Sequence, residues 1–145
     1  MKNEKKLNNK GFSLVELIIV IAIMAVLIGV LAPQYMRYVE RGRVSADRDN
    51  VDAIISAMQV YAVDPQVAST AAIPNGTTLT INRSGVDGTV HANVAAALTN
   101  AGLPATPPAL TNRNTFDQVV ITYTADGTNF TVTAAYTNGG TAVTF

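Results

Sequence analysis

Residues 12–33 read FSLVELIIVIAIMAVLIGVLAP, an apolar run with one charged side chain, the carboxylate of Glu16. As an α-helix, residues 12–32 would be ~31 Å long, which matches the hydrocarbon thickness of a bilayer. The run therefore predicts a transmembrane helix. A charge in hydrocarbon is costly and is usually paired, so Glu16 is a candidate functional residue.

A short basic segment, residues 1–11, precedes the run and contains every lysine of the chain. Four arginines follow the run within about fifteen residues, so counting positive charges does not orient the helix. We expect the N-terminus in the cytoplasm, because a short leader is easily retained there and the folded part follows the span. An ordinary cleaved secretory signal is disfavoured, because the apolar run is long and Leu31-Ala32-Pro33-Gln34 matches A-x-A poorly.

The helix is predicted to continue through residues 34–63 with one apolar face, and to end near Val63 because Asp64 precedes Pro65. The spacing places these residues on the inner face: Val44, Val51, Ile54, Ile55, Met58, Tyr61 and Ala62. The charged residues fill the other positions: Arg41, Arg43, Asp47, Arg48, Asp49 and Asp52. This charged face either is solvated or contacts a neighbouring copy.

Residues 64–145 predict a globular head. Residues 77–82 alternate like a strand, and residues 89–101 read as a short helix on which His91 is a surface or capping residue. Residues 118–124, 129–136 and 141–145 alternate apolar residues with threonine, and Asp-Gly and Asn-Gly turns separate them. The fold class is α+β, a long N-terminal helix packed against a C-terminal antiparallel three-stranded meander. These residues should face the helix: Val119, Ile121, Tyr123, Phe130, Val132, Ala134, Tyr136, Val143 and Phe145.

The composition and the motifs of the chain exclude several classes of function. Net charge is zero, which gives no sign of a nucleic-acid partner, and the chain has no cysteine and one histidine. It contains no G-x-x-x-x-G-K-[ST], G-x-G-x-x-G or H-E-x-x-H motif, and Asp87 and Asp126 are lone turn acids rather than a calcium loop. The sequence therefore predicts a chain that is not an enzyme and needs no metal or cofactor.

The stretch KGFSLVELIIVIAIMAVLIGVLAP resembles the class III signal of type IV pilins over roughly residues 1–65. The likeness consists of a basic leader ending in Gly11, then Phe12, then Glu16 as the fifth residue after the leader, then the apolar run with Pro33. The resemblance implies cleavage between Gly11 and Phe12 by a prepilin peptidase and N-methylation of Phe12 by the same enzyme. It also implies assembly with other copies, a membrane platform protein and an assembly ATPase.

Cleavage would give Glu16 a partner. The new α-amine of Phe12 lies about one helical turn from the carboxylate. In a water-free bundle of helices, the amine of one subunit facing Glu16 of a neighbour satisfies both charges and fixes the axial step. Two alternatives stay open: Glu16 lies shallow near the headgroups, or it pairs with the amine of its own chain.

Gly29 and Pro33 are the helix breakers of the run. We expect them to bend the helix in the monomer, and the resemblance implies that the backbone from about Ala25 to Pro33 loosens in a filament; a simple proline kink is the alternative. The segments expected are a leader (1–11), an assembly helix (12–33), an amphipathic helix (34–63) and a head (64–145).

The predicted function is a pilus subunit for adhesion, motility or DNA uptake. One alternative is a pseudopilin of a type II secretion or competence system, although the calcium site usual in major secretion pseudopilins is not recognisable. The other is a monomeric membrane-tethered binding domain.

Overall fold

The computed structural model describes residues 11–68, 71–127 and 129–145, so the predicted leader, Gly11 apart, lies outside the described residues. The chain divides into two compact units, Met1–Tyr38 (unit 1) and Val39–Phe145 (unit 2). Helix α1, Leu14–Val63, belongs to both. It ends at the residue predicted, and it remains helical through Gly29 and Pro33.

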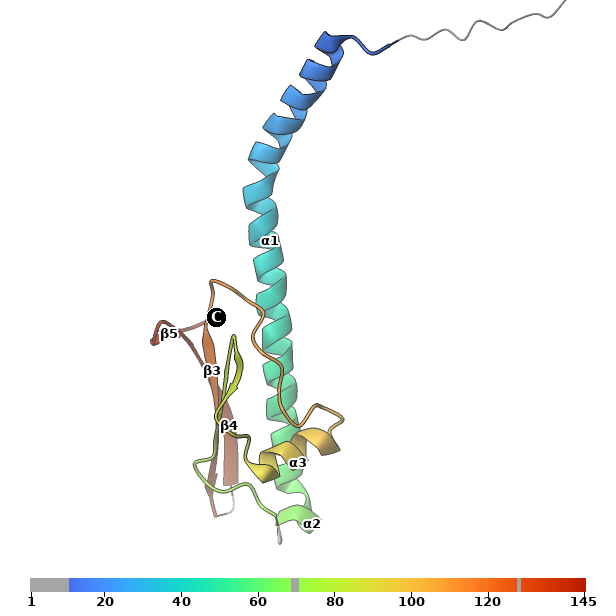
Figure 1. Ribbon diagram of the computed structural model, residues 1–145. Coiled ribbons are helices and arrows are strands. Elements are labelled where there is room, and N and C mark those ends of the chain that lie inside the picture. The colour runs from blue at the N-terminus through green and yellow to red at the C-terminus, as the bar shows by residue number, and fades with distance from the viewer. Residues whose placement is uncertain (1–10, 69–70, 128) are drawn as a thin grey trace, which may run out of the picture. The chain divides into compact units, whose positions relative to one another are not determined.

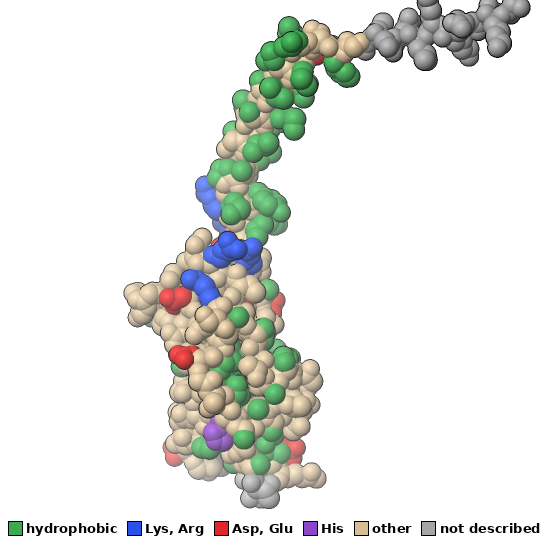
Figure 2. All heavy atoms as spheres, viewed as in Figure 1, with side chains coloured by type: hydrophobic (Ala, Val, Ile, Leu, Met, Phe, Trp, Pro, Cys, Tyr) green, Lys and Arg blue, Asp and Glu red, His purple; other side chains and the backbone are tan. Residues whose placement is uncertain are grey.

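The described part of unit 1 is an apolar helix with its side chains on the surface. Its most apolar window has a mean hydropathy of 3.1 and none of it is buried, so by length and composition α1 could cross a membrane. Figure 2 shows hydrophobic side chains covering this part of the chain. A helix that is apolar on all sides needs lipid or other helices around it.

Unit 2 contains an antiparallel five-stranded sheet in the order β2-β1-β3-β4-β5 beside α1 (Figure 1). The strands are β1 Thr78–Asn82, β2 Gly85–Asp87, β3 Gln118–Asp126, β4 Asn129–Asn138 and β5 Thr141–Val143. The predicted meander is confirmed as β3–β4–β5, with left-handed glycines Gly127 and Gly139 in its two turns. The strand predicted at residues 77–82 is present as β1, and it extends the sheet by pairing with β3. Strand β2, which pairs with β1, was not predicted, because three residues are too few to show alternation.

The core of unit 2 lies between the sheet, α1 and helix α3, Ala92–Asn100. The predicted inner face of α1 is confirmed, since Val51, Ile54, Met58 and Tyr61 are buried. The sheet contributes Leu79, Ile81, Val119, Ile121, Tyr123 and Val132. Phe145 lies beyond the end of β5 and is 57% exposed, but it faces α1 as predicted, since the guanidinium of Arg48 lies 4.5 Å from its ring centroid.

Two local predictions need correction. Helix α3 begins at Ala92 rather than residue 89, because His91 is its N-cap and its Nδ1 accepts a hydrogen bond from the Asn93 N–H at 3.2 Å. The capping role expected for His91 is therefore confirmed. A short helix α2, Pro65–Ala68, was not predicted; Asp64 Oδ1 accepts the Gln66 N–H at its start.

Candidate functional site

The predicted assembly residues lie at the start of α1. Phe12 is 92% exposed, and the backbone N–H of Ser13 donates to Glu16 Oε2 at 2.9 Å. Ser13 precedes the first helical residue, so Ser13-Leu14-Val15-Glu16 has the S-x-x-E pattern of a capping box, with the Glu16 half of the box formed. This pattern is visible in the sequence and would have predicted the contact between Ser13 and Glu16.

The capping contact occupies one carboxylate oxygen of Glu16. Among the described residues, no base lies within ion-pair distance of it. A carboxylate in the first turn also interacts favourably with the helix dipole. Glu16 therefore has a local structural role, and its charge is still without a counter-ion within the described chain.

Gly29 and Pro33 do not interrupt α1. Nothing lies within 4 Å of a Cβ built on Gly29, and Pro33 is accommodated inside the helix. The loosening of this segment concerns the assembled state and stays a prediction.

A second group of carboxylates on α1 was not predicted to be structural. Asp47 was expected on the charged outer face, but it is 2% exposed. Its Oδ1 accepts the Thr111 hydroxyl at 2.7 Å and the Thr111 N–H at 2.9 Å, and its Oδ2 accepts the Asn112 N–H and side-chain amide at 2.8 Å each. Four donors from one loop thus satisfy this buried charge, as burial of a charge requires.

Glu40 holds the next residues of the same loop. Its Oε1 accepts the N–H groups of Arg113 at 2.6 Å and Asn114 at 2.7 Å. Glu40 and Asp47 are seven residues apart and so share a face of α1, about 10 Å apart along its axis. We call Glu40, Asp47 and residues 111–114 the carboxylate latch.

The latch changes the acidity of Asp47. Burial alone would raise the pKa of this carboxyl, but hydrogen bonds from Asn112 and Thr111 outweigh burial and leave its pKa below the ordinary value of 3.8. Asp47 is therefore ionised in the folded chain near neutral pH.

Further contacts tie the same loop to the sheet. Arg83 donates from Nε to the Asn112 carbonyl and from Nη2 to the Phe116 carbonyl, both at 3.1 Å. Asn138 Nδ2 donates to the Asn114 carbonyl at 2.9 Å. The loop is held by hydrogen bonds in a chain that has no cysteine.

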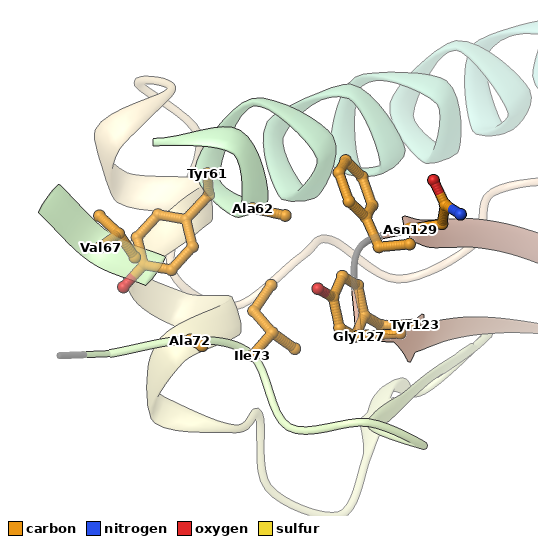
Figure 3. A pocket seen from close by; sticks show the side chains of 10 residues that line it. Tyr61, Ala62, Val67, Ala72, Ile73, Tyr123, Gly127 and Asn129 are labelled. Atoms are coloured by element: carbon orange, nitrogen blue, oxygen red, sulfur yellow. The ribbon is translucent and has the colours of Figure 1, made fainter. Parts of the chain in front are cut away.

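Unit 2 also has a cavity of about 240 Å³ where α1 ends (Figure 3). Tyr61 and Ala62 line it from α1, Val67 from α2, and Tyr123 and Asn129 from the β3–β4 hairpin. Its lining residues include no carboxylate or imidazole, so it offers no acid–base pair for catalysis. Within the described residues, no group of three acids or histidines could hold a metal.

Comparison with known proteins bears on the N-terminal region. Residues 6–32 match the family model of the prokaryotic N-terminal methylation motif. The N-terminal region of the chain is similar to that of type IV fimbrial proteins. Relatives of this chain include the type IV major fimbrial protein FimA of Dichelobacter nodosus, 36% identical over 41% of this chain and 38% of FimA. Fimbrial protein EcpC of Eikenella corrodens is 32% identical over 59% of this chain and 62% of EcpC.

A third relative is prepilin peptidase-dependent protein A of Clostridium perfringens, 34% identical over 46% of this chain and 49% of the relative. The chain thus matches between 38% and 62% of the length of these three relatives. No solved structure matches it. The likeness to type IV pilins predicted from the sequence is confirmed, and these relatives are named for fimbriae and prepilin processing rather than for an enzymatic activity.

Proposed function

We propose that this chain is the structural subunit of a type IV pilus. A prepilin peptidase cuts between Gly11 and Phe12 and methylates the new amine, and the apolar part of α1 then packs against the same segment of other copies. The observation that carries the proposal is the start of α1, where the Glu16 carboxylate heads an apolar helix with no base of the described chain beside it.

The chemistry of assembly follows from the capping contact. One oxygen of Glu16 is hydrogen-bonded to the Ser13 N–H. The other oxygen is available to the α-amine that cleavage creates on a neighbour, and a methylated amine still carries a positive charge and a donor N–H. An axial shift of four residues, about 6 Å, brings Phe12 of one copy level with Glu16 of the next.

Two proposals about location and partners accompany this one. Before assembly, the precursor is a single-pass protein of the cytoplasmic membrane with its N-terminus inside, and afterwards it is part of an extracellular filament. The filament serves adhesion, motility or DNA uptake, and its assembly uses a membrane platform protein and an ATPase. The subunit has no catalytic role.

The test combines intact-mass measurement with electron microscopy of cells that produce the chain. The proposal expects a mature mass that lacks residues 1–11 and contains one added methyl group, together with surface filaments that a Glu16→Ala variant does not form. An uncleaved mass with no filaments would instead support the membrane-tethered monomer. A cleaved, methylated chain that forms only short periplasmic fibres would support a pseudopilin.

A further inference from the structure

The basic residues of unit 2 gather at one end of it. Unit 2 contains no lysine, and its arginines are Arg41, Arg43, Arg48, Arg83 and Arg113. Figure 2 shows arginine side chains concentrated near the start of unit 2 on the face in view. Three of them lie within two turns of α1, and Arg83 and Arg113 join them through the carboxylate latch and its loop.

Within the described residues, the latch acids form an ion pair with only one of these arginines, Arg43. Glu40 accepts the backbone N–H groups of Arg113 and Asn114 with Oε1, and only its Oε2 approaches a guanidinium, that of Arg43 at 3.9 Å. Asp47 is buried and bonded to Thr111 and Asn112. The nearest other acids on α1, Asp49 and Asp52, follow Asp47 toward the C-terminal end of the helix.

The arginines differ in how far they are already engaged. Arg83 donates to two carbonyls, and the guanidinium of Arg48 lies 4.5 Å from the centroid of the Phe145 ring. Arg41 and Arg113 are exposed, and within the described residues neither forms an ion pair. These two side chains are therefore free to bind an anion from outside the chain.

We propose that this arginine patch, centred on Arg41 and Arg113, docks on the anionic phospholipid headgroups of the membrane that holds α1 before assembly. In the sequence, Arg41 follows Ala32, the last residue of the predicted span, by only nine residues. Guanidinium groups bind phosphate oxygens in bidentate fashion, and basic clusters beside a membrane span are attracted to anionic lipid. The inference rests on the proposed membrane-anchored precursor.

The test uses the full chain reconstituted in vesicles of phosphatidylcholine, with or without phosphatidylglycerol. Because the chain has no cysteine, Ser84→Cys places one fluorophore next to the patch, and Thr99→Cys places one on α3 for comparison. Quenching by a headgroup-labelled lipid reports docking. We expect stronger quenching at position 84 in the phosphatidylglycerol vesicles, decreasing as salt rises from about 0.1 M to about 1 M and the screening length falls from about 10 to about 3 Å.

The decisive comparison is between two variants of equal net charge. Arg41→Gln/Arg113→Gln should lower the ratio of docked to free unit 2 by about 30-fold, from about 1 kcal/mol for each arginine near the surface. Gln59→Glu/Asn129→Asp adds the same negative charge away from the patch and should change the ratio little. Arg113→Gln keeps the backbone N–H that Glu40 binds, so the fold is retained.

Equal quenching in both kinds of vesicle, or equal effects of the two double variants, would overturn the inference. So would quenching that requires added duplex DNA, which would assign the patch to nucleic acid. This assay does not measure filament formation, so a negative result would contradict only the docking inference and not the proposed pilus function. The pilus function is tested separately by the loss of filaments in Glu16→Ala chains, which does not depend on lipid charge.

Discussion

Replacing Asp47 is the sharpest test of the carboxylate latch. In Asp47→Ala, the donors that lose their acceptor are the N–H and hydroxyl of Thr111 and the N–H and side-chain amide of Asn112. Thr111 is exposed, so water can replace the lost bonds, but Asn112 is 1% exposed. Two buried donors at about 1–3 kcal/mol each give a destabilisation of about 4 kcal/mol.

Asp47→Asn should cost about 2 kcal/mol, because its one remaining oxygen still accepts from Asn112 while its amide faces other donors. The matched control is Asp49→Ala on the exposed side of the same helix, which should change stability by less than about 0.5 kcal/mol. The free energy of unfolding of all three variants is measured by chemical denaturation of the full chain in detergent. The chain has no tryptophan, so the buried Tyr61 and Tyr123 serve as fluorescence probes.

Hydrogen exchange locates the effect. The amides of Thr111 and Asn112 should lose protection in Asp47→Ala before the strand amides of β3 do, because the latch is the contact removed. If Asp47→Ala and Asp49→Ala unfold at the same denaturant concentration, or if the two amides exchange at unchanged rates, the latch does not stabilise unit 2.

Three further predictions concern the acidity of Asp47, the acidity of Tyr136 and the packing of Phe116. Because the pKa of Asp47 is lowered in the folded chain, its contribution to stability is complete above about pH 4 and is lost as pH falls through the folded-state pKa, so acid unfolding should be less steep in Asp47→Asn. Burial, with a smaller effect from Asp52, raises the pKa of Tyr136 above 10.0, so stability should fall as pH rises beyond that value; tyrosinate absorbance should appear at lower pH in Asp52→Asn. Phe116→Ala, at a side chain with no exposure, should cost about 3–5 kcal/mol in the same denaturation assay, and a loss below about 1 kcal/mol would contradict its place in the core.

Patterns along the chain predicted the parts of this fold that depend on neighbouring residues. Three- and four-residue spacing placed Val51, Met58 and Tyr61 inside, and the Asp-Gly and Asn-Gly turns set the meander. The pairing of β1 with β3 was not predictable in this way, because it joins segments about forty residues apart.

Asp47 shows why the carboxylate latch could not be predicted from the sequence. Helical periodicity gives the direction of a side chain but not the presence of a loop that arrives from residues 111–114. From the sequence alone, a carboxylate with arginines nearby on a helix is interpreted as solvent-exposed, because the loop that donates hydrogen bonds to it cannot be recognised. The S-x-x-E pattern at Ser13 was local and could have been read, whereas the donors of Asp47 lie 64 and 65 residues away in sequence.

Three acids of α1 thus accept hydrogen bonds from backbone N–H groups: Glu16, Glu40 and Asp47. The role of each acid depends on whether it has a carboxylate oxygen left to bind a partner. Asp47 uses both oxygens within the head and has no capacity for a partner. Glu16 uses one oxygen for Ser13, and among the described residues nothing of opposite charge approaches the other. A Glu16→Gln chain would keep an acceptor for the Ser13 N–H and lose only the charge, so it separates capping from assembly: if the proposed amine pairing holds, α1 still begins at the same residue while filaments fail to form.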